Sequence, residues 1–329
     1  MSKITFIVGN GLDLSLKLNT SYKAFYEYVK KHKLHPNNSI YKAIEKESPE
    51  WWADFELGLG RFTNTIEAVT EKERVKWSQT LNDELDEIKR DLKSYVREQN
   101  KLADEHIPNI QFTKESFYAG LETGQIANIR QRIPVGSTSA IRFVSLNYTD
   151  VLEKIFPRVG RAIAGLDYYI PSPVHHIHGS IDRKISLGVN DETQLSSYID
   201  NVEKGFLIKP ELIRMMNDGR IETLTQYINT SDIMVLFGVS LGATDRYIWN
   251  MVIEWLADSN RILVIHHYER GLDVSDLTER QALLLTDRVQ NKFLSHSSFD
   301  LEDEDKHQLK KKIYVIPNTT DLFTVRSVK

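Results

Sequence analysis

Short runs of apolar, strand-forming residues recur along the chain and predict six β-strands. The first covers residues 4–8, and the others cover residues 141–146, 174–178, 232–239, 261–267 and 312–317. Helical patterns separate several of these runs, for example at residues 150–156 and 246–258. This alternation favours an α/β fold, in which a Rossmann-like, parallel six-stranded sheet carries helices on both faces.

From about residue 20 to residue 135 the pattern becomes helical. Leu81, Leu85, Ile88, Leu92 and Tyr95 recur at three- and four-residue steps, which marks the buried face of one long amphipathic helix. We therefore predict a large helical insertion after the first strand and its turn, packed over the strand ends. In this division residues 1–19 and 136–329 form the Rossmann-like domain and residues 20–135 form the insertion.

Two segments admit two interpretations each. The stretch WWADFELGLGRF at residues 51–62 places paired tryptophans beside Asp54 and Glu56. These residues either line a pocket or anchor the helices to the sheet, and we favour the second because large aromatic side chains mostly bury. The acidic run at residues 300–308 is a solvated loop or a helix start.

Composition excludes several classes of function. The chain has 329 residues, a net charge of −4 and no cysteine, so it offers no general attraction to nucleic acid and no thiol chemistry or cysteine zinc site. No apolar run is long enough to cross a bilayer. We expect a cytoplasmic protein without a membrane partner.

Two glycines follow the first predicted strand in the sequence FIVGNGLDL. Gly9 and Gly11 can take positive φ, and their backbone amides can meet phosphate oxygens. A dinucleotide fingerprint needs a third glycine where Leu14 stands, so a plain tight turn remains an alternative. If the turn binds phosphate, Gly11→Val is expected to lower dinucleotide affinity and to leave the fold largely intact.

Similar polar signatures follow three further predicted strands. They are NYTD at residues 147–150, HGSID at residues 178–182 and GVSLGATD at residues 238–245. Because parallel strands end at one edge of a sheet, these segments are expected to converge on one rim with the GNG turn.

Together with NTSY and WADFE, these signatures resemble the AbiH family of bacterial phage abortive-infection proteins, and behind it the sirtuin-like fold that binds NAD. The resemblance spans residues 6–245. It implies an antiphage effector that binds NAD and hydrolyses its nicotinamide–ribose bond. Dinucleotide-binding residues are expected at Gly9, Asn10, Gly11, Asp13, Asp150, Gly238 and Ser240, and catalytic residues at Asn147 and His178.

The resemblance has two limits. Protein-deacetylating sirtuins carry a four-cysteine zinc module, so deacetylation is not expected of this chain. Asp13 would repel a phosphate unless it points away, caps the following helix or receives a ribose hydroxyl. For Asp150, capping of the helix at residues 151–156 is favoured over stabilisation of positive charge. The turn at Ser240 contacts nucleotide or is simply a strand-to-helix connection.

The rim residues suit the implied reaction. Nicotinamide leaves as a neutral molecule from a cationic ring, so the step needs positioning and one base rather than an acid. A neutral histidine is suited to that role near pH 7, and Asn147 can orient a ribose or a water. A structural histidine at residue 178 is the alternative assignment.

Two other functions remain open. The first is a nucleotide-binding sensor without turnover. The second is a metal-dependent hydrolase, in which His176 and His178 on one strand face bind metal with Asp182. NAD is expected as substrate, without a metal, and a phage-derived trigger and self-association are open as partners.

Overall fold

The computed structural model describes residues 1–46, 55–65, 70–104, 110–113, 115–134, 136–156, 159–160, 167–258, 260–318, 322 and 324–325. Trp51, Trp52 and Asp54 lie outside these ranges. The prediction that the two tryptophans belong to a core therefore concerns residues that the structure does not describe.

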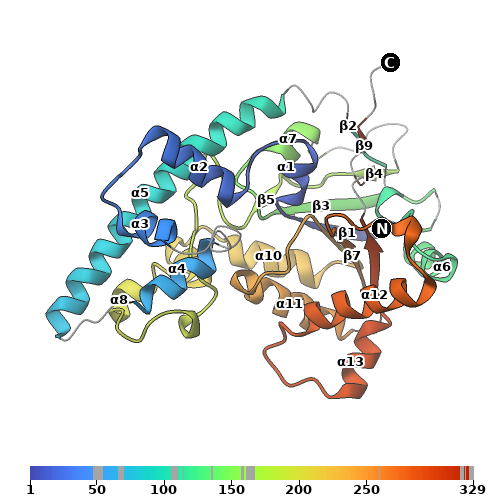
Figure 1. The fold of residues 1–329 in the computed structure, drawn as a ribbon. Coiled ribbons are helices and arrows are strands. Elements are labelled where there is room, and N and C mark those ends of the chain that lie inside the picture. The colour runs from blue at the N-terminus through green and yellow to red at the C-terminus, as the bar shows by residue number, and fades with distance from the viewer. Residues whose placement is uncertain are drawn as a thin grey trace.

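A parallel sheet forms the centre of the molecule, with strand order β4-β3-β1-β6-β7-β8 and with β5 paired to β3 (Figure 1). Its strands are β1 (Lys3–Val8), β3 (Ser139–Ser145), β4 (Tyr168–Tyr169), β5 (His175–His176), β6 (Ile233–Phe237), β7 (Ile262–His267) and β8 (Ile313–Pro317). A separate antiparallel pair joins β2 (Ile110–Gln111) to β9 (Thr324–Val325). The predicted parallel α/β fold is confirmed.

Two details of the sheet differ from the sequence prediction. The strand β4 was not predicted, because two tyrosines give too short a pattern to recognise. The strand predicted at residues 174–178 pairs only at His175–His176, since the chain turns directly after it.

Helices connect the strands and cover the sheet. They are α1 (Gly11–Ser15), α2 (Tyr22–His32), α3 (Ser39–Lys46), α4 (Phe55–Thr63), α5 (Glu71–Ala103), α6 (Thr123–Arg132), α7 (Val151–Ile155), α8 (Asn201–Lys204), α9 (Lys209–Met216), α10 (Arg220–Asn229), α11 (Arg246–Leu256), α12 (Glu279–Leu294) and α13 (Asp303–Lys310). Short 3-10 helices cover Ser116–Tyr118 (η3), Glu192–Gln194 (η4), Ala243–Asp245 (η5) and Val274–Asp276 (η6).

The strands alternate their side chains between two apolar cores. In β1, Phe6 packs in the core that includes Phe143 and Ile129, whereas Ile7 packs in the core that includes Trp249 and Val289. The first core meets α1, α6 and α7, and the second meets α10, α11 and α12. Burial of both faces explains why the strands are continuously apolar rather than alternating.

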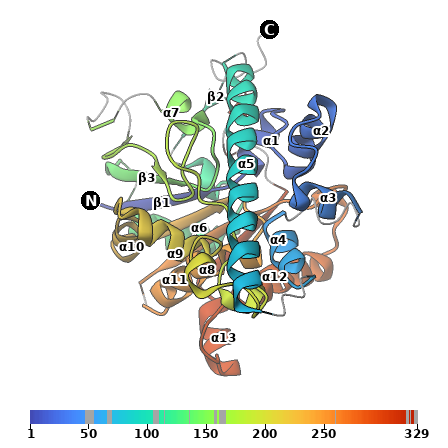
Figure 2. The same ribbon diagram turned by 90° about the vertical axis from the view of Figure 1, so that its left-hand side faces the viewer.

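A third core lies beyond the end of the sheet, where α2, α3, α4 and α5 pack together (Figures 1 and 2). The predicted stripe on α5 is buried in it, from Leu81 to Tyr95. Figure 2 shows α5 running across the front of this layer. Residues from the segment 181–208, such as Leu187 and Leu207, complete the same core. The division into two domains stays a prediction.

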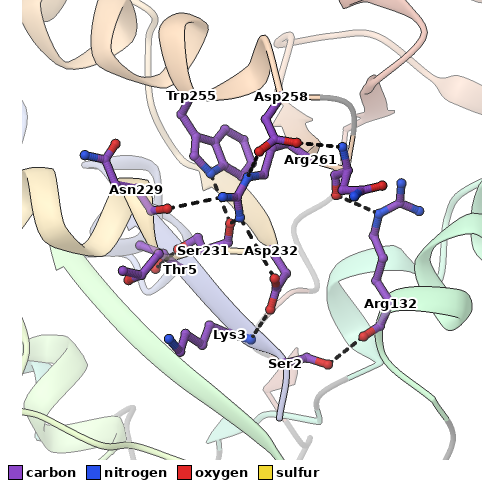
Figure 3. Close-up of polar contacts among 12 residues, drawn as sticks. Ser2, Lys3, Thr5, Arg132, Asn229, Ser231, Asp232, Trp255, Asp258 and Arg261 are labelled. Carbon is purple, nitrogen blue, oxygen red and sulfur yellow. Dashed lines mark hydrogen bonds and ion pairs between the residues drawn. The ribbon is translucent and has the colours of Figure 1, made fainter.

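The start of the chain is fixed by polar contacts at the amino ends of the strands (Figure 3). The backbone amide of Lys3 donates to Asp232 Oδ2 at 2.8 Å, and the hydroxyls of Thr5 and Ser231 are 2.6 Å apart. The indole of Trp255 and the guanidinium of Arg261 both donate to the carbonyl of Ser231. This edge is therefore occupied by structural contacts, and the polar signatures lie at the opposite edge.

Candidate functional site

A cavity of about 590 Å³ lies at the carboxyl ends of β1, β3 and β6. On the sheet side it is lined by residues 9–11, 13–14, 146–149 and 238–240, and on the helical side by residues of α2, α4 and α5. The chain runs from β1 to β3 on one side and later crosses to β6 on the other, so the cavity lies at the switch point of the sheet. Its volume is typical of small-molecule sites, which span about 300–1,000 Å³.

The GNG turn forms one wall of the cavity, but not in the predicted way. The amide of Gly9 donates to the carbonyl of Phe237 at 2.9 Å, and the amide of Gly11 donates to the carbonyl of Gly238 at 2.8 Å. Neither Gly9 nor Gly11 has a left-handed φ, whereas Gly238 does, at 66°. The expectation of free amides at these two glycines is wrong, because both amides join the turn to the end of β6.

Glycine is needed at position 11 because of packing. A Cβ there would lie 2.4 Å from the Cα of Gly238, and a Cβ on Gly238 would lie 2.8 Å from the Cα of Gly11. Two backbones thus meet where no side chain fits. Between these glycines, Asn10 accepts a hydrogen bond from the Thr20 hydroxyl at 2.5 Å, which links the turn to the start of α2.

Asn147 and Asp13 are in direct contact at the cavity wall. The Asn147 side-chain amide donates to the carbonyl of Gly9 and to Asp13 Oδ1, both at 3.1 Å. A backbone carbonyl only accepts, so these contacts fix which end of the amide is nitrogen. The Asn147 Oδ1 has no partner among the described residues and can accept from a ligand.

Asp13 neither caps a helix with its side chain nor points to solvent. It is 1% exposed and accepts from the Thr149 hydroxyl at 3.1 and 3.0 Å in addition to Asn147. Burial raises the pKa of Asp13 to about 7, although hydrogen bonds from Thr149, Thr20 and Asn147 favour the carboxylate. Near neutral pH this carboxyl is thus only partly charged, which reduces its repulsion of an anionic ligand.

His176 and His178 do not form a metal pair. His176 places Nδ1 3.0 Å from the carbonyl of Asn147 and Nε2 2.7 Å from Glu153 Oε1, so both ring nitrogens have protein partners. His178 lines the cavity and places Nε2 3.2 Å from Asp245 Oδ1. In the part of the chain that the structure describes, no three histidine or carboxylate side chains are arranged to hold a metal ion.

The contact between His178 and Asp245 belongs to a buried cluster that sequence reasoning missed. Lys209 places Nζ 2.6 Å from Asp245 Oδ1 and 2.7 Å from Glu56 Oε2. Asp245 and Glu56 lie in two of the quoted signatures, GVSLGATD and WADFE, which were the available signals. Lys209 gave none, because a single lysine before a proline at the start of a helix is ordinarily a surface residue.

One predicted site residue lies differently from expectation, because Asp150 is not among the residues that line the cavity. Asp150 occupies the N-cap position of α7, but its side chain makes no capping hydrogen bond and instead lies 3.3 Å from Lys154 Nζ. The expected side-chain cap is therefore wrong. Ser240 does line the cavity, and its carbonyl accepts from Lys292 Nζ at 2.8 Å.

These features define a class of protein: a doubly wound α/β protein with a cavity at its switch point and a histidine–aspartate pair in the cavity wall. Residues 5–267 match the family described as "Bacteriophage abortive infection AbiH". The chain belongs to this family, and its biological role is in phage abortive infection. No curated protein matches the chain with significant similarity. Within the described ranges, no helix combines the length and the apolar character that a membrane span requires.

Proposed function

We propose that this chain is a phage-defence effector that cleaves the nicotinamide–ribose bond of NAD in the cavity at the ends of β1, β3 and β6. The observation that carries the proposal is the position of His178, which lines this cavity while Asp245 holds its Nε2 at 3.2 Å. A histidine oriented by a carboxylate beside a ligand site is the arrangement of a general base.

The proposed step is a hydrolysis. The bond between C1′ of the ribose and the nicotinamide nitrogen breaks, and its electron pair neutralises the positive charge of the ring. The oxygen of a water molecule bonds to C1′, and His178 accepts the proton of that water. The products are nicotinamide, ADP-ribose and one proton, which returns to solvent.

Asn147 supplies orientation in this proposal. Its amide nitrogen is committed to Gly9 and Asp13, so Oδ1 is the atom left to accept a hydrogen bond from a ribose hydroxyl or the water. Thr149 and Gly9 hold the surrounding wall in place through the same network. Positioned groups of this kind commonly contribute about 10²-fold or more to a rate.

The diphosphate needs donors other than the amides of Gly9 and Gly11. The cavity is also lined by Thr20 to Lys23, where α2 begins. Ser21 accepts from the amide of Ala24, which leaves the amides of Tyr22 and Lys23 without a partner in the described structure. These amides and the Lys23 ammonium favour an anion at this end of the cavity.

The test is to incubate the purified protein with NAD, with and without lysate of phage-infected cells, and to measure nicotinamide and ADP-ribose by mass spectrometry. Release of both products in equal amounts supports the proposal. NAD binding without release indicates a sensor, and activity that EDTA abolishes indicates a metal-dependent hydrolase. Either result overturns the proposed reaction.

Variants then assign the activity to the cavity. His178→Ala and Asn147→Ala are each expected to reduce turnover by about 10²-fold or more, and the double variant by much less than the product, because both residues serve one step. His175→Ala is the matched control. His175 is buried on β5, three residues before His178, does not line the cavity, and contacts the carbonyl of Arg220. Wild-type turnover by His178→Ala would exclude His178 as the base.

A further inference from the structure

A group of charges with little exposure surrounds His178 in the cavity wall, where Asp245 and Glu56 line the cavity and Lys209 lies behind them. Asp245 Oδ1 is shared between His178 Nε2 at 3.2 Å and Lys209 Nζ at 2.6 Å. Lys209 also contacts Glu56 Oε2 at 2.7 Å, and Glu56 Oε1 accepts from the amide of Gly188 at 3.2 Å. The side chains of Lys209 and Glu56 are only 1% and 8% exposed. The cluster is therefore largely shielded from water, and its members depend on one another.

Asp245 can contact His178 and Lys209 because its side chain does not cap its own helix. Asp245 occupies the N-cap position of α11, where an aspartate ordinarily accepts from the first-turn amides, but it makes no such hydrogen bond. Asn190 replaces it, because its Oδ1 accepts from the amide of Tyr247 at 2.7 Å. With the helix capped by Asn190, the carboxylate of Asp245 points to His178 and Lys209 instead.

The contacts of His178 determine where its proton lies. Nε2 faces the carboxylate of Asp245, which only accepts, and the hydroxyl of Tyr247 at 3.3 Å. A neutral imidazole in this position carries its proton on Nε2. Nδ1 is then the acceptor, and it has no partner among the described residues, while the side chain lines the cavity.

The electrostatics keep Asp245 ionised. Burial by itself raises the pKa of Asp245, but the Lys209 ammonium and His178 oppose this and hold the pKa well below its usual range. Burial by itself lowers the pKa of Lys209, and the two carboxylates hold it above its usual range. Burial raises the pKa of Glu56 despite the contact with Lys209.

We infer that Asp245, supported by Lys209 and Glu56, is a positioning residue that fixes the proton of His178 on Nε2 and presents Nδ1 to the cavity as the proton acceptor. The part of this inference that concerns catalysis rests on the proposed function; the part that concerns the proton on His178 does not. The titratable groups that interact with His178 directly are Glu56, Asp245 and Tyr247. Those that interact with Asp245 are Tyr22, Tyr148, Lys209 and His296, and Arg220 interacts with Tyr247.

The first experiment measures the tautomer directly. The full chain is labelled with ¹⁵N at its ten histidines, and the ring nitrogens are observed by NMR, with His178→Gln used to assign the signals of His178. The expected result is a protonated Nε2 and an unprotonated Nδ1 in the wild type. In Asp245→Asn this preference is expected to be lost. A proton on Nδ1 in the wild type, or an unchanged tautomer in Asp245→Asn, would overturn the inference.

Glu153→Gln is the matched control for this measurement. It makes the same kind of substitution at the neighbouring histidine, because Glu153 Oε1 lies 2.7 Å from His176 Nε2. The signals of His176 are expected to change and those of His178 to remain. A change at His178 of the same size as in Asp245→Asn would indicate a general disturbance of the site and would overturn the specific role of Asp245.

The second experiment uses turnover of NAD. Asp245→Asn is expected to lower kcat by at least about 10²-fold with little change in KM, and to alter the acidic limb of the pH–rate profile. Asp245→Glu keeps the charge and is expected to recover part of the rate. Unchanged kcat and an unchanged profile in Asp245→Asn would overturn the catalytic part. If the wild type releases no nicotinamide, the proposed function fails, whereas the NMR result still decides the tautomer.

Discussion

Gly11 allows the backbones of two turns in the cavity wall to lie in close contact. Because a Cβ at this position would lie 2.4 Å from the Cα of Gly238, Gly11→Ala is expected to destabilise the protein by about 2 kcal/mol or more. Gly124→Ala is the control, since Gly124 is also helical and a Cβ there meets nothing within 4 Å. Chemical denaturation of both variants measures the difference.

This geometry also changes the expected effect of Gly11→Val. A larger side chain at this position acts on the fold before it acts on ligand affinity, so the variant cannot serve as a selective test of binding. Equal stability of Gly11→Ala and Gly124→Ala would contradict the close packing of the two turns.

Asp13 gives the protein a specific dependence on pH. Its pKa is about 7 in the folded chain and about 4 when unfolded, so the folded state binds more protons between these values. Its contribution to the free energy of unfolding therefore falls as pH rises from about 4 to about 7 and is constant above that. Relative to Asp13→Asn, the wild type is expected to lose up to about 4 kcal/mol over this window.

Denaturation of both proteins at several pH values checks this expectation, because the difference between them cancels the other titrating groups. If the free energy of unfolding of the wild type instead rose relative to that of Asp13→Asn as pH rises, the change would have the opposite sign to this prediction. It would mean that the hydrogen bonds from Thr149 and Asn147 outweigh burial and that Asp13 is fully ionised near neutral pH.

At the scale of elements, Lys209 connects three separate parts of the chain. It lies at the start of α9, and it joins Glu56 on α4 to Asp245 at the end of η5. Lys209→Met is expected to destabilise the protein by about 3–5 kcal/mol, because two buried carboxylates lose their cation.

Lys204→Met is the matched control for this prediction. Lys204 lies nearby on α8, and its partner Glu192 is 71% exposed, so the loss of this ion pair is expected to cost less than about 1 kcal/mol. Guanidinium denaturation of both variants measures the contrast. Similar stability of the two variants would contradict a buried, mutually dependent cluster.

At the scale of the whole molecule, the cavity lies between the sheet and the layer formed by α2 to α5. Leu14 lines it from α1 and is 49% exposed, so Leu14→Trp is expected to fill part of the cavity without disturbing a core. NAD affinity, measured by calorimetry, is expected to fall at least tenfold. Leu102→Trp, a substitution at a 45% exposed leucine that does not line the cavity, is expected to bind as the wild type does. Equal NAD affinities of Leu14→Trp and Leu102→Trp would show that NAD does not bind in this cavity.

The sequence by itself determined the layers of the molecule. Continuous apolar runs specify buried parallel strands, and the stripe on α5 specifies one buried helix face, because side-chain periodicity follows directly from backbone geometry. It also indicated that the segments around Gly9, Asn147, His178 and Gly238 meet at one edge, since parallel strands end together; all four line the cavity.

Only the tertiary structure decided which atoms are free. The amides of Gly9 and Gly11 are committed to the end of β6, and Asp245 is released from its helix by Asn190; both facts depend on residues more than 50 positions away in sequence. Lys209 became part of the site for the same reason: it is buried between two carboxylates that local patterns do not connect. Hydrogen bonding and charge pairing depend on distance in space, whereas a sequence pattern reports only the neighbours along the chain.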